Sequence, residues 1–369
     1  MRILHLLNDV EELGNGIINV AVDLACSQVK AGHAVWVASG GGSYELLLGE
    51  YGVQHVLLRQ SRQPLTLMQA AIDYPGLIRR VQPDIVHAHM MTGVVLATVM
   101  RFAGSYKLVA TVHNEFQRSA ILMGLADRVI AVSQAVADAM MRRGIAPQKL
   151  RVVRNGPLHT PRLRRSQSPM PLHRPAITTV AGLRDRKGIA ELITAFEHIA
   201  AVIPMAHLYL VGDGPDRAKY EQQASASPYR DRIHFAGFQP DPMRYLHSSD
   251  VFVLASRQEP FGLVLAEARE AGCAIVATQV DGIPEALDQG QAGILVPPGD
   301  VPAIATALHT LLTQPEQLRH WQQCAQQNLG WLSVERVNRE TLAVYGEVTL
   351  AKPAAVYSLL RSLFPQTSE

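Results

Sequence analysis

Residues 251–285 read VFVLASRQEPFGLVLAEAREAGCAIVATQVDGIPE, and this stretch decides the fold more than any other. Its apolar run from Val251 to Ala255 predicts a buried strand, and after a polar loop a helix is expected to begin at about Leu263. A second strand is expected over Ala274–Ala277. A strand, a helix and another strand in direct succession are typical of a parallel α/β sheet.

Two carboxylates flank the predicted strand-to-helix junction. Glu259 lies in the loop at the carboxyl end of the strand, where open α/β sheets bind ligands, and Glu267 lies one to two turns into the helix. The free backbone N–H groups of the helix N-terminus between them form a potential anion site. An anion site next to two carboxylates that accept hydrogen bonds from hydroxyls is suited to a phosphorylated sugar.

The same alternation of short apolar runs and amphipathic stretches continues on both sides of this segment. Strands are expected over Arg2–Leu7, Ala34–Ala38, His55–Leu58, Ile85–His89, Leu108–His113, Val129–Val132, Leu150–Val153, Ile177–Ala181, His207–Val211, Ile233–Phe235, Val251–Leu254, Ala274–Ala277 and Gly293–Val296. Helices are expected over Ile17–Lys30, Leu67–Arg80, Gly93–Phe102, Ala135–Arg142, Gly188–Ala200, Asp216–Ala226, Pro242–His247, Leu263–Ala271 and Pro302–Gln327. The pattern predicts an α/β fold with two doubly wound parallel sheets.

A break in this pattern divides the chain. Periodicity is lost in a proline-rich stretch with arginines and serines, which we interpret as a linker over residues 161–175. The predicted N-terminal domain covers residues 1–160 and the C-terminal domain residues 176–345. Residues 346–369 are expected to form a C-terminal helix that packs back on the N-terminal domain.

Composition limits the class of protein. The chain is 48% hydrophobic and 18% charged, and no apolar run approaches the roughly 20 residues that span a bilayer. Three cysteines without a CxxC pair, Cys26, Cys273 and Cys324, favour reduced core thiols in a cytoplasmic protein. Residues 1–170 hold 18 Lys and Arg against 11 Asp and Glu, a net charge of +7, and the remainder carries −5. The basic half is either ordinary surface variation or a face toward an anionic partner such as membrane lipid.

Two further motifs lie at predicted strand-to-helix junctions. Lys187-Gly188 ends the sequence VAGLRDRKG, where a cation beside a helix start can neutralise phosphate. Gly212-Asp213-Gly214-Pro215 follows a strand, and its glycines allow a close approach of backbone or ligand. Alone, the second motif is a common tight turn.

Together these motifs resemble a known family. Glu259 and Glu267 match the E-x7-E motif of retaining glycosyltransferases of the GT4 family, Lys187-Gly188 matches the end of its G-R-L-x-x-x-K-G element, and Gly212 begins its G-D-G-P element. The resemblance covers roughly residues 1–330 and implies the GT-B fold, in which two Rossmann-like domains face an interdomain cleft.

The resemblance implies roles for residues of the C-terminal half. Glu259 would bind hydroxyls of the donor sugar and Glu267 the ribose, while Lys187 and the N–H groups of Phe261, Gly262 and Leu263 would bind the diphosphate. Gly212 would border the nucleotide base. The family's arginine is replaced by Gly182, so Arg184 either supplies the charge from a shifted position or is an ordinary surface arginine.

In the N-terminal half, Gly14-Asn15-Gly16 resembles the family's glycine-rich first loop, with Gly16 expected to approach the donor phosphate. His113 matches the family's T-x-H position close to the transferred sugar, and a catalytic role is assigned to it together with Glu259 and Lys187. The acceptor-side candidates are Asn15, His89 and Asn114. His89 belongs to a D-x-V-H-x-H match.

The resemblance thus implies a retaining hexosyltransferase that uses a nucleotide sugar and a saccharide or glycolipid acceptor in polysaccharide or lipopolysaccharide synthesis. No cofactor and no metal are expected, because neither H-E-x-x-H nor a D-x-D signature occurs. No nucleic-acid partner is expected, and the predicted location is cytoplasmic, with peripheral contact at the inner membrane face. The alternatives are a GT-B sugar-nucleotide epimerase and an inactive sugar-nucleotide-binding subunit. A nicotinamide dehydrogenase is disfavoured, since the G-x-G-x-x-G fingerprint is missing.

Overall fold

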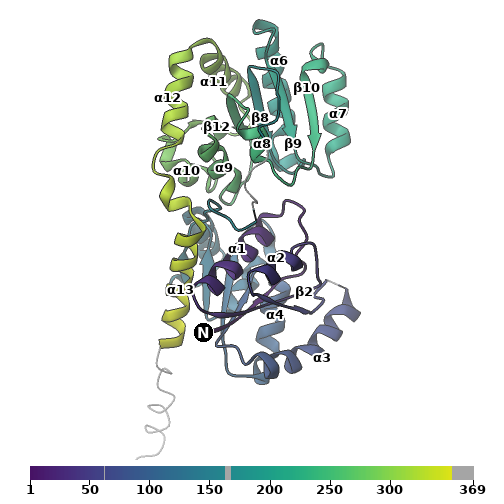
Figure 1. The fold of residues 1–369 in the computed structure, drawn as a ribbon, viewed down its shortest axis with the longest axis vertical. Coiled ribbons are helices and arrows are strands. Elements are labelled where there is room, and N and C mark those ends of the chain that lie inside the picture. The colour runs from purple at the N-terminus through teal and green to yellow at the C-terminus, as the bar shows by residue number, and fades with distance from the viewer. Residues whose placement is uncertain (62, 163–167, 351–369) are drawn as a thin grey trace, which may run out of the picture.

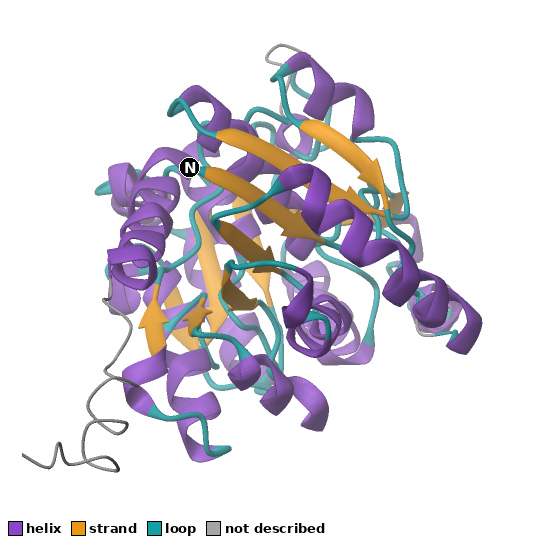
Figure 2. Ribbon diagram, turned by 90° about the horizontal axis from the view of Figure 1, so that it is seen from below, coloured by secondary structure: helices purple, strands orange, loops and turns teal. Residues whose placement is uncertain are grey.

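A computed structural model of the protein describes residues 1–61, 63–162 and 168–350 of the 369. Two α/β domains are stacked along the long axis of the molecule, as Figure 1 shows, with the N-terminal half below and the C-terminal half above. Each domain is built on one parallel sheet with helices on both of its faces (Figures 1 and 2). The predicted fold class of two doubly wound parallel sheets is therefore confirmed.

The N-terminal sheet has seven parallel strands in the order β3-β2-β1-β4-β5-β6-β7. These strands are β1 (Arg2–Leu6), β2 (Ala34–Ser39), β3 (Gln54–Leu57), β4 (Ile85–Ala88), β5 (Lys107–Val112), β6 (Arg128–Ala131) and β7 (Leu150–Val152). The strand order changes direction between β1 and β4, and such a switch point leaves a crevice beyond the carboxyl ends of the strands. Ligands of open α/β sheets bind in this crevice.

Helices cover both faces of this sheet. They are α1 (Gly16–Lys30), α2 (Glu45–Glu50), α3 (Pro64–Val81), α4 (Met91–Val99) and α5 (Gln134–Arg142), with 3-10 segments at Arg101–Ala103, Arg118–Leu125 and Pro147–Lys149. Helix α1 begins close to its expected position because Asn15 caps it, the side-chain oxygen accepting a 3.1 Å hydrogen bond from the backbone N–H of Ile17. The sequence reading missed α2 and the segment Arg118–Leu125, which are short.

The C-terminal sheet has six parallel strands in the equivalent order β10-β9-β8-β11-β12-β13. They are β8 (Ala176–Val180), β9 (His207–Val211), β10 (Ile233–Gly237), β11 (Val251–Leu254), β12 (Ala274–Thr278) and β13 (Ile294–Val296). The helices around this sheet are α6 (Ile189–Val202), α7 (Arg217–Ser225), α8 (Met243–Leu246), α9 (Leu263–Ala271), α10 (Ile283–Ala286), α11 (Val301–Thr313) and α12 (Pro315–Ala325). Short 3-10 segments lie at Asp185–Lys187, Arg230–Arg232, Asp288–Gly290 and Leu329–Leu332. Here the switch point lies between β8 and β11.

The prediction of a single helix over Pro302–Gln327 is wrong. The structure has two helices, α11 and α12, with extended backbone at Gln314 between them. Pro315 causes the break, because a proline disfavours helical backbone in the residue before it and is tolerated in the first turn of a new helix.

The chain returns to the N-terminal domain at its end. Helix α13 (Val334–Leu350) runs alongside the lower domain in Figure 1 and packs on α1, β5 and β6. Its Tyr345 is completely buried there. The helix predicted for residues 346–369 lies, beyond Leu350, outside the described residues.

Two expectations on composition can be compared with the structure. Cys26 and Cys273 are buried as core thiols, but Cys324 on α12 is partly exposed, so the prediction of a core position is wrong for this residue. Among the described residues, no helix has both the length and the apolar character that crossing a membrane requires.

Candidate active site between the two sheets

Glu259 lies in the loop that joins β11 to α9, at the switch point of the C-terminal sheet. Its carboxylate forms an ion pair with Lys187 and accepts a 3.2 Å hydrogen bond from the hydroxyl of Ser256. Its backbone is fixed as well, since its N–H donates to Asp281 at 2.8 Å and its carbonyl accepts from the N–H of Gly282 at 3.1 Å. Two predicted site residues separated by 72 positions are thus in direct contact.

Lys187 reaches Glu259 because the loop after β8 packs tightly on the end of β11. Gly188 has a φ of 65°, and a Cβ at this position would stand 1.9 Å from the carbonyl oxygen of Ala255. Only glycine fits there, which explains the Lys-Gly pair. Arg184 is exposed, and no hydrogen bond or ion pair joins its side chain to another described residue. The structure does not bring Arg184 to Glu259.

The backbone at the start of α9 offers a row of donors. No hydrogen bond from the N–H groups of Phe261, Gly262 or Leu263 to another described residue is found. Gly262 has a φ of 83°, and a Cβ there would lie 3.0 Å from a methyl group of Leu265, so the sharp turn requires glycine. Phe261 is buried, and its ring packs nearly perpendicular to that of Trp331, which holds this turn in place. Unpaired N–H groups at a helix start attract anions.

Glu267, the second carboxylate, lies one turn into α9 and is partly buried. Desolvation raises the pKa of its carboxyl, an effect opposed by the nearby guanidinium of Arg162. Arg162 in turn binds Asp23 of α1 with two bonds of 2.8 and 3.1 Å. A charged group from the predicted linker therefore stands between the two domains, next to Glu267.

The position of Gly212 in the fold requires a glycine for steric reasons. Its φ is 131°, and a Cβ would lie 2.0 Å from the carbonyl oxygen of Ala181. Its N–H donates to the carbonyl of Gly237 at 2.8 Å, which joins the loop after β9 to the end of β10. The motif thus shapes the end of the sheet, and no contact with Glu259 or Lys187 is found.

Gly16 meets the C-terminal domain directly. A Cβ on this residue would stand 3.0 Å from a methyl group of Leu263, so the first turns of α1 and α9 approach each other across the domain boundary. Asn15 is used as the cap of α1. The two helix N-termini at this contact both follow switch-point strands.

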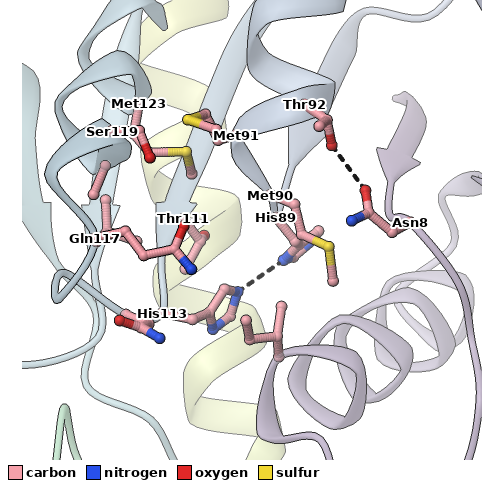
Figure 3. Close-up of a pocket in the computed structure, with 14 residues that line it drawn as sticks. Asn8, His89, Met90, Met91, Thr92, Thr111, His113, Gln117, Ser119 and Met123 are labelled. Carbon is pink, nitrogen blue, oxygen red and sulfur yellow. Dashed lines mark hydrogen bonds between the residues drawn. The ribbon is translucent and has the colours of Figure 1, made fainter. Parts of the chain in front are cut away.

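A pocket opens at the carboxyl ends of β1, β4 and β5 (Figure 3). His89 and His113 follow the last strand residues, Ala88 and Val112, one position outside the strands that were expected to include them. Nδ1 of His89 lies 3.1 Å from Nε2 of His113, the bond drawn between them in Figure 3. Asn114 also borders the pocket, and its side chain accepts a 2.9 Å hydrogen bond from the N–H of Phe116.

Sequence reasoning missed two carboxylates of this region. Glu115 is 5% exposed, and one of its oxygens is buried without a hydrogen bond to another described residue. Burial raises the pKa of its carboxyl, and the carboxylates of Asp281 and Glu259 across the domain boundary raise it further. Glu285 of α10 bonds to the N-terminal domain. Glu115 could have been found from the sequence as an acidic residue just after the end of a strand. Glu285 could have been found as the last residue of the Gly-Ile-Pro-Glu turn.

One group of side chains could in principle hold a metal ion. Among the described residues, only His5, His87 and His89 bring three potential ligand atoms within 4.8 Å of one another. All three side chains are buried, and each ring nitrogen is within hydrogen-bond distance of another side chain. The ring centroids of His87 and His89 are 4.2 Å apart with the planes inclined by 28°. A metal ion bound to these three residues would have to replace hydrogen bonds that their ring nitrogens now form.

The comparison with protein families covers both domains. Residues 162–328 match the family described as "Glycosyl transferases group 1", and residues 14–157 match "Glycosyltransferase Family 4". The boundary between the two matches falls at the start of the proline-rich stretch.

Curated relatives support the same family at low identity. The lipopolysaccharide core biosynthesis glycosyltransferase LpsE of Rhizobium meliloti (strain 1021) is 26% identical over 64% of this chain and 67% of its own length. The glycogen synthase of Mycobacterium tuberculosis (strain CDC 1551 / Oshkosh) is 26% identical over 69% of this chain and 66% of its own length. The aligned part is thus about two thirds of each relative.

Among solved structures, Anabaena Alr3699/HepE in complex with UDP-glucose superposes with a TM-score of 0.78. It is 20% identical and the superposition covers 94% of this chain and 99% of that one, which establishes the shared fold. With matches to both domains and the Glu259–Lys187 contact at the switch point, the chain belongs to the GT4 family of glycosyltransferases, enzymes of the GT-B fold and, here, of the retaining hexosyltransferase type.

Proposed function

We propose that this enzyme transfers a sugar from a nucleotide-sugar donor to a saccharide or glycolipid acceptor, in the synthesis of cell-surface polysaccharide or lipopolysaccharide. The donor-binding part of this proposal rests on one observation. Lys187 contacts Glu259 next to the N–H groups of Phe261, Gly262 and Leu263, which have no partner among the described residues. A cation and a row of N–H groups bind a diphosphate, and a carboxylate binds sugar hydroxyls. The three elements are adjacent and belong to one switch point.

In this proposal the ion pair is rearranged when the donor binds. Lys187 turns from Glu259 to the diphosphate, and Glu259 accepts hydrogen bonds from hydroxyls of the transferred sugar. Glu267 accepts from the ribose, where the raised pKa of its free carboxyl falls again on contact with hydroxyl donors. Since Arg184 is exposed, the diphosphate depends on Lys187 and on the backbone of α9, and Gly212 forms the wall near the base.

The chemical step exchanges one bond at the anomeric carbon for another on the same face of the sugar. The bond to the leaving phosphate oxygen breaks, the bond to the acceptor hydroxyl oxygen forms, and the departing phosphate takes the acceptor proton. Lys187 and the N–H groups of α9 stabilise the charge that develops on the departing diphosphate. Contact of the two domains at Gly16 and Leu263 favours the exclusion of water, which would otherwise hydrolyse the donor.

The acceptor is proposed to enter the pocket of the N-terminal domain, where His89, Asn114 and Asn8 offer polar groups, while His113 is proposed to face the transferred sugar. A glycolipid or lipopolysaccharide acceptor is supported by the likeness to LpsE and by the net charge of +7 over residues 1–170. A basic domain attracts an anionic membrane surface. We therefore place the enzyme in the cytoplasm with peripheral contact at the inner membrane face.

A panel of nucleotide sugars tests the donor. The protein is incubated with UDP-, GDP-, ADP- and dTDP-sugars, and ligand-induced thermal shifts are followed by an assay of nucleoside diphosphate release with saccharide acceptors. A ligand that binds the folded state raises the melting temperature in proportion to the logarithm of its concentration over Kd. Stabilisation by one nucleotide sugar is expected, and it should be lost in Glu259→Gln and retained in Glu270→Gln on the helix α9 that follows. Stabilisation by NAD(H) and by none of the sugars contradicts the proposal.

A further inference from the structure

Three histidines, His5, His89 and His113, form a continuous chain from the core of the N-terminal domain to the pocket, and the ring of a fourth, His87, packs against His5 and His89. His5 belongs to β1, His87 to β4, His89 follows β4, and His113 follows β5. Nδ1 of His5 lies 2.9 Å from Nε2 of His89, and Nδ1 of His89 lies 3.1 Å from Nε2 of His113. His5 is fully buried and His113 is 9% exposed, so the chain leads from the interior to the ligand side of the sheet.

The inner end of the chain is the side-chain amide of Gln28. The side-chain oxygen of Gln28 lies 2.8 Å from Nε2 of His5, and because this oxygen can only accept, Nε2 of His5 carries the proton. The amide nitrogen of Gln28 donates to the hydroxyl of Tyr345 at 3.3 Å. The proton of that hydroxyl can therefore be assigned to the contact with Nδ1 of His87 at 2.6 Å, which leaves Nε2–H of His87 to donate to the hydroxyl of Thr111 at 2.7 Å.

Each ring in the chain is held in the neutral form. Burial lowers the pKa of His5 to about 4 and that of His113 to about 3, and burial lowers the pKa of His89 well below its usual value. A neutral imidazole has one N–H and one unprotonated nitrogen. The position of one proton therefore decides the position of the next along the chain.

Starting at Gln28, the protons can be assigned in order. Nδ1 of His5 is unprotonated and accepts from Nε2–H of His89. Nδ1 of His89 is then unprotonated and accepts from Nε2–H of His113. The remaining nitrogen, Nδ1 of His113, is left without a proton. It points away from His89 in Figure 3, and no hydrogen bond joins it to another described residue.

We propose that Gln28, through His5 and His89, holds His113 in the Nε2–H form, so that its Nδ1 accepts a hydrogen bond from a hydroxyl group of the transferred sugar. Gln28, His5 and His89 are positioning residues, and none of them needs to touch the substrate. The pocket would then select a sugar with a hydroxyl at this point over one with a deoxy, carbonyl or carboxylate group, which cannot donate. The substrate part of this inference rests on the proposed function, and the tautomer part does not.

The tautomer is measured on the free enzyme by ¹⁵N NMR of ¹⁵N-histidine-labelled protein, with His113 assigned through His113→Asn. We expect a pyrrole-type shift at Nε2 and a pyridine-type shift at Nδ1. In Gln28→Met, which keeps the side-chain volume but removes the acceptor, His113 is expected to show both tautomers in exchange. An Nδ1–H form of His113 in the unaltered protein, or an unchanged signal in Gln28→Met, would overturn the inference.

Two further variants separate positioning from packing. Gln28→Glu keeps an oxygen toward His5, so the Nε2–H signal of His113 is expected to be restored. The new carboxylate accepts from Tyr345, which must then accept from Nδ1–H of His87, so His87 alone changes tautomer. Tyr345→Phe releases the Gln28 amide and should mix the tautomers, whereas Tyr74→Phe removes a buried hydroxyl that bonds to Tyr106 and should leave every histidine signal unchanged.

Measurements of enzyme activity provide the second test of this inference. With the nucleotide sugar chosen by the panel, kcat/KM is expected to fall about tenfold in Gln28→Met and to recover in Gln28→Glu. Among monodeoxy analogues of that sugar, one should have a kcat/KM about tenfold below that of the parent sugar in the unaltered enzyme. In Gln28→Met, the same analogue and the parent sugar should have equal kcat/KM. Equal losses for every analogue in both proteins would refute the hydroxyl contact while leaving the NMR result standing. Absence of turnover with every donor would refute the proposed function instead.

Discussion

The carboxylate of Glu285 and the guanidinium of Arg154 form an ion pair between the two domains, with 2.6 Å between Oε2 and Nε. The same carboxylate accepts hydrogen bonds from the backbone N–H groups of Gln134 and Ala135 at 3.0 and 3.1 Å, so a residue of α10 completes the N-terminus of α5 in the other domain. A carboxylate at a helix N-terminus is stabilised by the helix dipole. Three residues before it, Gly282 bonds to the backbone of Glu259. The segment therefore joins the proposed donor loop to the N-terminal domain.

Replacing Glu285 should weaken both the domain contact and donor binding. Glu285→Ala removes all three bonds, and we expect the melting temperature to fall by a few degrees, because a partly buried charge-assisted contact contributes roughly 1.5–3 kcal/mol. The KM for the donor should rise several-fold, since Glu259 loses its support. Glu285→Gln keeps an acceptor for one N–H and should be intermediate. Calorimetry and steady-state kinetics check this, and unchanged values for both in Glu285→Ala would show that the contact has no role.

The Lys187–Glu259 pair should be essential for transfer. Removal of one group that stabilises charge in a transition state typically costs about 100- to 1000-fold in kcat, and we expect losses of this size in Lys187→Met and in Glu259→Gln. Because both act on one bound donor, the double variant should lose much less than the product of the two single losses. Lys219→Met, at an exposed site of the same domain, is the matched control. Near-normal turnover in either single variant rules out the assigned role.

Glu115 should make the stability of the free enzyme depend on pH. Its folded-state pKa is raised by burial and by the neighbouring carboxylates of Asp281 and Glu259. As the pH rises above the unfolded value near 4.5, the unfolded state loses its proton first, so the folded state is progressively destabilised until the pH passes the raised pKa. Glu115→Gln removes this penalty, and it should be as stable as the unaltered protein at pH 4 and more stable at pH 7.

Melting temperatures measured from pH 4 to pH 8 test this expectation. The difference between Glu115→Gln and the unaltered protein should grow with pH, while Glu316→Gln, at an exposed position of α12, should give no such gain. A Glu115→Gln protein that is less stable than the unaltered one at pH 7 would mean that the ionised carboxylate is favoured in the fold. If Glu115 also contacts substrate, turnover falls in the same variant, so stability and activity change in opposite directions.

An apolar face of α3 should mediate contact with anionic membranes. Leu65, Met68 and Ile72 are 76%, 58% and 65% exposed, and their spacing of three and four places them on one side of the helix. The double change Leu65→Asp with Met68→Asp should reduce co-sedimentation with phosphatidylglycerol vesicles several-fold. The change Val202→Asp with Met205→Asp, at equally exposed apolar positions of the acidic half, should not. Equal binding to neutral phosphatidylcholine vesicles, or no binding to either kind, would contradict the role of the basic domain.

The amino-acid sequence by itself determined the two α/β domains and their strands. Apolar runs and glycine turns are local features, so strands such as His207–Val211 and Val251–Leu254 and the helix Leu263–Ala271 have the expected bounds. The helix break before Pro315 is also a local effect, because a proline disfavours helical backbone in the residue before it. The Lys187 and Glu259 elements could be recognised because each lies in a short motif.

Tertiary structure alone decided which of these residues meet. The contact of Lys187 with Glu259 spans 72 positions, that of Arg154 with Glu285 spans 131, and the bond from Gln28 to Tyr345 spans 317. No local sequence pattern predicts contacts between residues so far apart in the chain, because these contacts depend on strand order and on how the two domains pack. The unpaired oxygen of Glu115 and the direction of the histidine chain arise in the same way, from the burial and the partners that only the assembled fold provides.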